Sequence, residues 1–349
     1  MRWLVAAASA AVIISSTLGA ASTLDIYFID VEGGQSTLIV TPAGESLLVD
    51  AGFPGDGTFS SKPGDPQRAR DARRIAGVAK AAGLSAIDYL LVTHFHADHD
   101  GGVVELSKLL PIRTFIDHGN INPETELNVK GSMAMLVAYA AVRAKAQRAE
   151  PKAGERLPLK GVDAVVVSTG GTTLTRPIAA APATPGCAPA ARPAQEPYEN
   201  PRSTGFVMQY GRFRFLDVGD LTGQPLFSLT CPASLVGSVD VYLVAHHGGA
   251  DASDAATFAA FRPRVAVLNN GAMKGGDPEM FEALRHAAGI EDVWQLHRSE
   301  KPDAANFDDE RIANLSESTA HSIKLSARED GSFQVTNGRT GQTKTYAAR

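Results

Sequence analysis

The segment His94-Phe95-His96-Ala97-Asp98-His99 gathers three imidazoles and one carboxylate within one short turn. In an extended segment, side chains two residues apart point the same way, so His94 and His96 can bind one metal ion. The turn that follows would bring Asp98 and His99 towards a second ion. Imidazole and carboxylate suit Zn²⁺ or a neighbouring divalent cation, and the segment lacks cysteine, the usual ligand of closed structural zinc sites. The spacing predicts an open, hydrolytic centre with two adjacent metals.

A strand is expected to deliver this turn. The apolar run 87–93 precedes the turn directly, and Gly101-Gly102 follows it. An apolar run bounded by turn residues predicts a buried strand, which leaves the ligands at its carboxyl end. The alternative interpretation is a histidine-rich surface loop that binds no metal. The preceding strand and the double glycine favour the metal site.

The composition is typical of a globular protein. The chain has 349 residues, of which 44% are hydrophobic and 20% charged, and this excludes a disordered or fibrous protein. The formal net charge of −5 gives no strong signature for binding a nucleic-acid backbone. A local basic cluster, which we interpret as a solvated helix face, is formed by Arg68, Arg70, Arg73 and Arg74. The oligomeric state stays open.

The amino terminus has the layout of a secretory signal. Arg2 precedes the apolar stretch 4–14, and small residues follow through Ser22. The apolar stretch is shorter than the roughly 20 residues that a membrane-spanning helix requires. We therefore expect residues 1–21 to be cleaved and the protein to be exported, periplasmic or secreted, with no membrane span in the mature chain.

An alanine- and proline-rich segment interrupts the chain at 176–201, with seven prolines and no sustained periodicity. We expect a long surface loop rather than a domain linker, because the motifs on both sides belong to one site. Cys187 lies in this segment and Cys231 beyond it. In an oxidising compartment the two could form one disulfide, and two free thiols are equally compatible with the sequence.

Strands and helices alternate in both halves of the chain, which predicts two sheets faced by helices. In the first half, we expect strands at 24–31, 37–41, 46–49, 87–93, 112–117 and 162–167, and helices at 65–82, 103–110 and 132–150. In the second half, we expect a hairpin of 206–210 and 212–218, strands at 240–245, 265–268 and 293–296, a helix at 278–288 and a closing hairpin within 321–346.

Three further signals stand where predicted strands end: Asp50 in LLVDAG, Asp220 in LDVGDL, and the pair His246-His247 in AHHGG. Together with the HFHADH segment, this set resembles the metallo-β-lactamase superfamily over nearly the whole mature chain. The resemblance implies an α/β fold, the four-layer αββα sandwich, as one domain over residues 22–349. It also implies a metal cleft along one edge of the sandwich.

Within the superfamily, the chain resembles the ComEC-type competence hydrolase domains, and phosphorylcholine esterases share much of the pattern. The matching residues are 28–31, Asn200, Ser203, 219–221 and the HHGG element. The resemblance implies that His94 and His96 bind a first metal. It implies that Asp98, His99 and His247 bind a second, with Asp220 bridging the two. We favour His247 over His246 as the ligand, and we expect Asp50 to orient a ligand imidazole.

The chain departs from the family at several positions. Many members supply a third histidine to the first metal, but no histidine occurs here between His118 and His246. His118, Asn200 or water could fill that place. The lineage usually has Gly and Asp where this chain has Glu32 and Ser36, and a downstream histidine is replaced by Asp277. These departures prevent the transfer of a substrate from the family.

A metal explains what the cluster is for. A divalent ion lowers the pKa of a bound water from about 15.7 towards about 7, which gives hydroxide at neutral pH. We expect Zn²⁺, as one or two ions, or Mn²⁺, and hydrolysis of an ester, with a phosphodiester as the first choice. Asp98 can orient the hydroxide, and His246 or His118 could protonate the leaving group. The alternatives are a β-lactamase or lactonase, a secreted nuclease, and a metal-binding module without turnover.

Overall fold

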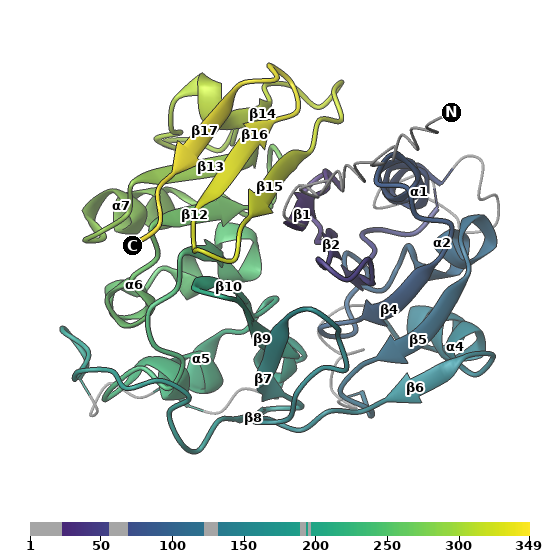
Figure 1. Ribbon diagram of the computed structural model, residues 1–349, viewed down its shortest axis with the longest axis horizontal. Coiled ribbons are helices and arrows are strands. Elements are labelled where there is room, and N and C mark those ends of the chain that lie inside the picture. The colour runs from purple at the N-terminus through teal and green to yellow at the C-terminus, as the bar shows by residue number, and fades with distance from the viewer. Residues whose placement is uncertain (1–22, 56–68, 122–131, 189–192, 195–196) are drawn as a thin grey trace, which may run out of the picture.

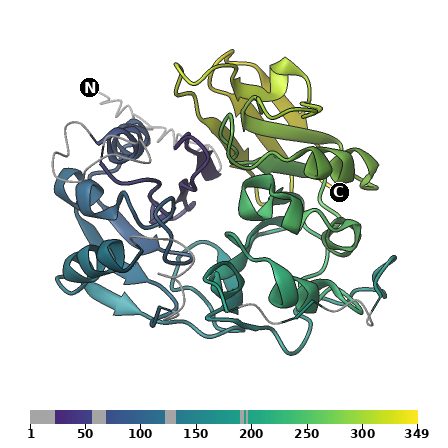
Figure 2. The ribbon, with the colours of Figure 1, turned by 180° about the vertical axis from the view of Figure 1, so that it is seen from behind.

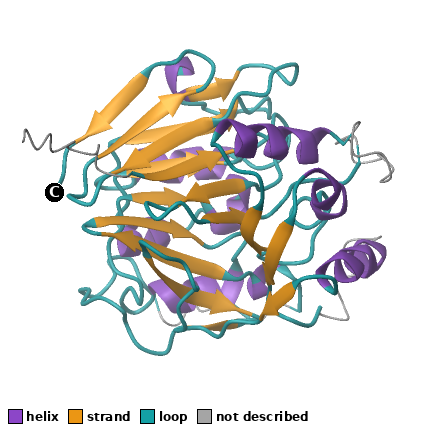
Figure 3. Ribbon diagram, turned by 45° about the vertical axis from the view of Figure 1, so that its right-hand side comes forward, coloured by secondary structure: helices purple, strands orange, loops and turns teal. Residues whose placement is uncertain are grey.

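The computed structural model describes residues 23–55, 69–121, 132–188, 193–194 and 197–349 (Figure 1). Within these ranges the strands form two sheets. The first sheet has the order β17-β16-β15-β1-β2-β3-β4-β5-β6, and the second has the order β14-β13-β12-β11-β10-β9-β7-β8. The prediction of two sheets faced by helices is thereby confirmed. Figure 3 shows the helices on the outer sides of the strands.

The first sheet comprises β1 (Leu24–Phe28), β2 (Thr37–Val40), β3 (Ser46–Val49), β4 (Ile87–Leu91), β5 (Ile112–Ile116), β6 (Gln147–Ala149), β15 (Ile323–Ala327), β16 (Phe333–Asn337) and β17 (Thr343–Tyr346). The second comprises β7 (Asp163–Thr169), β8 (Thr172–Thr173), β9 (Gly205–Tyr210), β10 (Phe213–Asp217), β11 (Val241–Leu243), β12 (Val265–Leu268), β13 (Asp292–His297) and β14 (Ile312–Asn314). The helices are α1 (Arg70–Ala81), α2 (Val103–Leu109), α4 (Ser132–Arg143), α5 (Gly223–Thr230), α6 (Ala255–Phe261) and α7 (Pro278–His286). Single 3₁₀ turns are η2 (Asn200–Arg202), η3 (Ala245–Gly248), η4 (Ala250–Ala252) and η5 (Asp309–Arg311).

Three apolar layers hold this sandwich together. Between the sheets, alternate residues of the strands interdigitate, with Phe28 of β1 and Phe215 of β10 in edge contact at 6.0 Å between ring centroids. Ile75 of α1 belongs to a second cluster, which lies between the first sheet and α1, α2 and α4. Met280 of α7 belongs to a third, beneath α5, α6 and α7. The two sheets and their two outer helix layers confirm the αββα architecture.

The first described strand and the C-terminal strands meet in the first sheet. β15 pairs antiparallel with β1, with Leu24 opposite Ala327, so the C-terminal strands extend the sheet that the N-terminal half begins (Figure 1). Seen from behind, the N-terminal and C-terminal halves lie on opposite sides of the molecule (Figure 2). The closing hairpin is confirmed, and its return to β1 explains why the last strands are as apolar on one face as the first.

The predicted helix over 132–150 is wrong in its last third. α4 ends at Arg143, and Gln147–Ala149 form β6, a parallel edge strand beside β5 with Thr114 opposite Gln147. Helix-forming composition favoured a longer helix, but the open edge of β5 offers backbone hydrogen bonds that local propensity does not reveal. α5, α6 and β14 were not predicted at all.

The described part of the 176–201 segment is linked to the end of α5. Cys187 and Cys231 are joined in a disulfide, with 5.6 Å between their Cα atoms. The structure therefore selects one of the two states that the sequence left open. Among the described helices, none has the length and apolarity needed to traverse a bilayer. The predicted signal segment 1–21 lies outside the described residues.

Asp217, at the end of β10, links the two sheets. Its carboxylate accepts hydrogen bonds from Nε2 of Gln35, at 3.0 and 3.1 Å, and from the backbone N–H of Gly219, at 3.0 Å. Gln35 lies in the loop between β1 and β2, so the contact joins loops of opposite sheets. Burial raises the pKa of Asp217 to about 7.

We expect Asp217→Asn to stabilise the metal-free protein above pH 7 and to leave its stability unchanged below about pH 4. Asp217 ionises near its ordinary pKa of 3.8 when unfolded and near 7 when folded, so stability falls as the pH rises through this window. The difference corresponds to at most about 4 kcal/mol. Urea unfolding at pH 4, 6 and 8 measures it. An equal advantage of the variant at pH 4 and pH 8 would contradict the raised pKa.

Candidate metal centre

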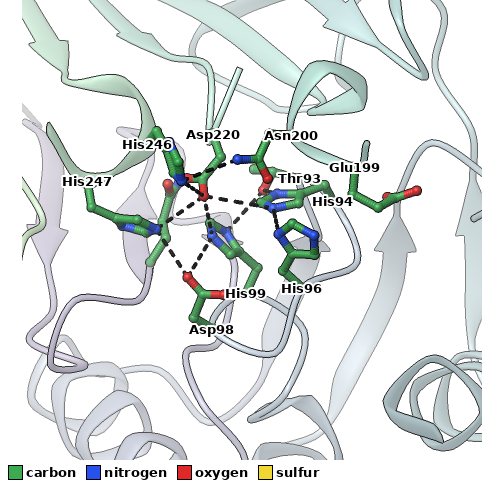
Figure 4. A network of polar contacts seen from close by, with 12 residues as sticks. Thr93, His94, His96, Asp98, His99, Glu199, Asn200, Asp220, His246 and His247 are labelled. Atoms are coloured by element: carbon green, nitrogen blue, oxygen red, sulfur yellow. Dashed lines mark hydrogen bonds and ion pairs between the residues drawn. The ribbon is translucent and has the colours of Figure 1, made fainter. Parts of the chain in front are cut away.

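The ends of several strands converge on one edge of the sandwich. β3 leads into Asp50 and β4 into the 94–99 turn, while β10 leads into Asp220 and β11 into η3 with His246 and His247. β3 and β4 are parallel neighbours in the first sheet, and β10 and β11 are parallel neighbours in the second. Because parallel strands end at the same edge, each sheet presents its polar residues side by side. Packing of the two sheets brings the two sets together (Figure 4).

Four of the predicted ligands form one compact group. Asp98, His99, Asp220 and His247 are all buried, and one ligand atom from each lies within 4.8 Å of the other three. Oδ2 of Asp220 is 3.2 Å from Nε2 of both His99 and His247, and Oδ2 of Asp98 is 3.3 and 3.2 Å from the same two nitrogens. Two carboxylate oxygens and two imidazole nitrogens at this spacing fit a divalent cation.

The two remaining predicted ligands lie beside this group. Nε2 of His94 is 2.9 Å from Nδ1 of His96 and 3.8 Å from Oδ2 of Asp220. Asp220 therefore stands between the two sets of imidazoles, where a bridging carboxylate is required. Its second oxygen, Oδ1, is buried and makes no hydrogen bond within the described part of the chain. An unpartnered buried carboxylate oxygen is a free donor for a cation.

The charges around the group keep both of its carboxylates ionised. Burial alone would raise the pKa of Asp98, but the Lys274 ammonium and His99 outweigh it and hold the pKa well below its usual value. Burial likewise opposes ionisation of Asp220, and His247 and His99 overcome it. Burial lowers the pKa of His94 well below its usual value. The group thus combines two carboxylates with a neutral imidazole beside them.

Asp50 holds the imidazole of His99 in place without facing the group. Its Oδ2 accepts a hydrogen bond from Nδ1 of His99 at 2.7 Å and another from Oγ1 of Thr93 at 2.7 Å. The backbone N–H of Thr93 donates to its other oxygen at 2.8 Å. Burial raises the pKa of Asp50, although His99 and Thr93 oppose the shift. This contact leaves Nε2 of His99 turned towards Asp98 and Asp220, as the sequence predicts.

Unusual backbone conformations place the second-sheet residues. His246 and His247 have φ of 51° and 54°, in the left-handed region that residues other than glycine rarely adopt. Such residues cost of order 1–3 kcal/mol each and persist only when the surroundings impose them. Gly219 has φ of 55°, and a Cβ there would lie 2.8 Å from Cβ of Thr93. The glycine before Asp220 is therefore required by the close approach of the two sheets.

His246 lies at the partly exposed rim of the centre, outside the group of Asp98, His99, Asp220 and His247. Its side chain is 29% exposed, and its Nε2 is 3.7 Å from Oδ2 of Asp220. Nδ1 lies 2.7 Å from Oδ1 of Asp251, and Nε2 lies 3.2 Å from Nδ2 of Asn200. Burial lowers the pKa of His246, but Asp220 and Asp251 outweigh it, so the net shift is upwards. This position suits a group that exchanges protons with a bound molecule.

The structure does not bring His118 to the rim. Its imidazole is fully buried, with Nε2 2.9 Å from Oε2 of Glu199, and its ring packs on Phe95 at 4.6 Å between centroids. A buried imidazole in this contact has no access to a leaving group, which corrects the role suggested for it. Glu199, which the sequence reasoning missed, also accepts a hydrogen bond from the backbone N–H of Phe95. It therefore supports the backbone between His94 and His96, while its side chain points away from the group (Figure 4).

A cleft of about 780 Å³ opens beside the group. His246, His247, Met273 and Lys274 are among the residues that line it, and Met273 is 59% exposed. Lys274 was not predicted; its ammonium contacts Asp98 and donates to the carbonyl of Gly33 at 3.0 Å.

Two arginines of α1 also line the cleft, so the solvated helix face predicted for them is wrong. Arg70 pairs with Asp71 at 2.6 Å, and Arg74 contacts Asp30 at 2.8 Å and Glu32 at 2.9 Å. Both are pulled inwards by buried carboxylates. The cluster of Asp30, Glu32 and His297 could itself hold a cation, but the Arg74 guanidinium already supplies the positive charge there.

Comparison with known families gives one match. Residues 29–191 match the model of the metallo-beta-lactamase superfamily, which is a family of metallo-hydrolases. This stretch contains the 94–99 turn and Asp50 but ends before Asp220 and the histidine pair. A search of curated proteins finds no match to the chain.

Solved structures match the chain at low sequence identity and low TM-score. CmlA, a diiron beta-hydroxylase from Streptomyces venezuelae, is 16% identical with a TM-score of 0.44, covering 77% of this chain and 52% of its own. YhfI, a metallo-beta-lactamase fold protein from Bacillus subtilis, is 11% identical with a TM-score of 0.44, covering 78% and 96%. MEM-A1, a subclass B3 metallo-beta-lactamase from a soil metagenome library, is 14% identical with a TM-score of 0.39, covering 69% and 86%. The chain thus spans about half the length of CmlA.

We predict that Asp50→Asn weakens Zn²⁺ binding by about 10- to 100-fold, because the amide no longer offers two acceptor oxygens to His99 and Thr93. Competition with a chromophoric chelator measures the affinity. Asp163→Asn, which alters an exposed carboxylate paired with Arg156, is the matched control and should bind as the wild type does. Equal Zn²⁺ affinities for the two variants would remove Asp50 from the centre.

Proposed function

We propose that this protein, whose membership of the metallo-β-lactamase superfamily the family match supports, is an exported metal-dependent hydrolase of esters, with phosphodiesters as its first substrate class. The observation that carries the proposal is the convergence of Asp98, His99, Asp220 and His247 within 4.8 Å beside an open cleft. When bound there, a divalent ion would lower the pKa of a water and polarise the ester. Zn²⁺ is the first choice, and Mn²⁺ the second.

The residues around the group have separate tasks in this proposal. Asp98 and Asp220 supply negative charge, and His99 and His247 supply nitrogen donors. In its protonated form His246, which is hydrogen-bonded to Asp251, would donate the proton on Nε2 to the leaving group, and this step would leave the neutral ring. His118 has no such task, because its ring is buried against Phe95 and Glu199.

Asn200 is our candidate for the missing donor of the first metal. Asp251 accepts the proton on Nδ1 of a neutral His246, so Nε2 of that ring accepts from the amide nitrogen of Asn200. The amide oxygen must then point the other way. It is buried and has no hydrogen-bond partner among the described residues, and Figure 4 draws it on the side of His94. His94, His96, Asn200 and Asp220 would form a weaker site than the four-ligand group.

Export and lineage belong to the same proposal. The Cys187–Cys231 disulfide supports an oxidising compartment, since such bonds are rare in reducing cytosol. The motifs before the β9–β10 hairpin and at η3 support descent within the ComEC-type lineage. Glu32 and Asp277 differ from the residues usual in that lineage. The natural substrate, a phosphodiester or another ester, therefore has to be identified by assay.

Turnover of bis-p-nitrophenyl phosphate tests the proposed reaction. We expect activity with added Zn²⁺ or Mn²⁺, its loss with chelator, and at least about a 100-fold loss in His96→Ala and His247→Ala. His286→Ala, which alters an exposed histidine of α7, is the matched control and should keep full activity. Activity that survives both chelation and His247→Ala would refute the proposal. Nitrocefin, a lactone and linear DNA, assayed in parallel, would reassign the substrate if one of them is preferred.

Metal content tests the assignment of Asn200. Wild-type protein dialysed against Zn²⁺ should hold two equivalents, and Asn200→Ala should hold one, by elemental analysis. Asn200→Asp should restore the second equivalent, because it retains an oxygen donor. Two equivalents retained in Asn200→Ala would assign the missing ligand to water instead.

A further inference from the structure

Lys274 contacts the four-ligand group through Asp98 and also lines the cleft. It lies in the loop between β12 and α7, and its backbone carbonyl accepts from the N–H of Gly271 at 2.9 Å. Gly275, next in the loop, has φ of 65°, and a Cβ there would lie 2.2 Å from the carbonyl oxygen of His247. The loop is therefore packed tightly against the histidine pair. From it the Lys274 side chain crosses to the first sheet and contacts Asp98 and Gly33.

The partners of the ammonium are unequal. Asp98 is the one carboxylate that the described residues bring into ion-pair contact with Lys274, and Asp98 belongs to the four-ligand group. The other contact, the carbonyl of Gly33, carries no net charge. Lys274 and a divalent ion would therefore draw on the same carboxylate. The ammonium and the cation would both be positively charged and would repel one another beside Asp98. Each would therefore weaken the binding of the other to that carboxylate.

The ammonium is also open to the cleft. Its side chain is 30% exposed, and Lys274 lines the same cleft as His246 and His247. An ammonium has three N–H donors, and two are directed at Asp98 and Gly33. Once a cation takes up part of the charge of Asp98, the ammonium can pair with an anionic oxygen brought into the cleft.

We propose that Lys274 is the residue that recognises a negatively charged oxygen next to the scissile bond, and that it opposes metal binding until such an anion arrives. The substrate class is an ester that carries an anion at the reacting end, as a phosphodiester or an ester beside a carboxylate does. This inference rests on the proposed function and deepens it. A neutral ester would gain nothing from Lys274.

Lys301 provides the matched control. It is also a partly buried lysine, 21% exposed, and it lines the same cleft. Its ion pair is with Asp277, which lies outside the four-ligand group and accepts a hydrogen bond from the N–H of Ala250. Removing its charge changes the cleft without changing the charge on any proposed ligand.

Zn²⁺ affinity is the first readout, and it does not depend on turnover. Lys274→Met should bind Zn²⁺ about tenfold more tightly than the wild type, because a competing positive charge is gone. Lys274→Arg, which keeps the charge, and Lys301→Met should both stay within about threefold of the wild type. Unchanged or weaker Zn²⁺ binding in Lys274→Met would overturn the competition between ammonium and metal.

Anion binding is the second readout. Inorganic phosphate should bind the Zn²⁺-loaded wild type and Lys301→Met alike by calorimetry, and Lys274→Met about tenfold more weakly. KM for bis-p-nitrophenyl phosphate and for a carboxylate-bearing ester should rise to a similar extent, with p-nitrophenyl acetate unaffected. An equal loss for the neutral ester would overturn the recognition of an anion. If the wild type hydrolyses none of these esters, the proposed function fails, while the Zn²⁺ and phosphate affinities still decide the role of Lys274.

Discussion

The centre depends on the balance of charge around two buried carboxylates. Leaving an ionised carboxylate in a protein interior without partners costs several kcal/mol, so Asp98 and Asp220 require positive charge close by. The imidazoles of His99 and His247 and the ammonium of Lys274 supply part of it. A divalent cation would supply it more compactly, since one ion can contact both carboxylates and both imidazoles. The surrounding features, from the Asp50 contact to the left-handed turns at η3, keep these groups within reach of one another.

This arrangement exists only when both sheets are packed. His99 and Asp220 are 121 residues apart, and Lys274 and Asp98 are 176 apart, yet each pair is in contact. The Gln35–Asp217 hydrogen bonds tie the same two edges together close by. Because every such contact crosses from one sheet to the other, the stability of the interlayer core and the geometry of the centre are coupled. Loops carry the polar side chains of the centre, and the strands fix where those loops begin.

Much of the centre was predictable from the sequence. Histidine and aspartate at short spacing after an apolar run are uncommon and single out the 94–99 turn, and the resemblance to the metallo-β-lactamase superfamily groups Asp220 and His247 with that turn in advance. Lys274 and Glu199 could not. A lysine in a glycine-rich loop and a glutamate at the end of a proline-rich one show no periodicity, and their partners lie far away in sequence. β6 was missed for the same reason, since the open edge of β5 determines it. His118 was given a role in the centre that it does not have. A histidine near a strand end can instead form a buried ion pair, as His118 does with Glu199.

Anomalous diffraction from crystals grown with Zn²⁺, recorded on both sides of the zinc edge, tests the central claim most directly. We expect a peak surrounded by Asp98, His99, Asp220 and His247, at about 2.0–2.2 Å from each ligand atom. An empty group, or a peak only among Asp30, Glu32 and His297, would contradict the assignment of this edge as the metal centre.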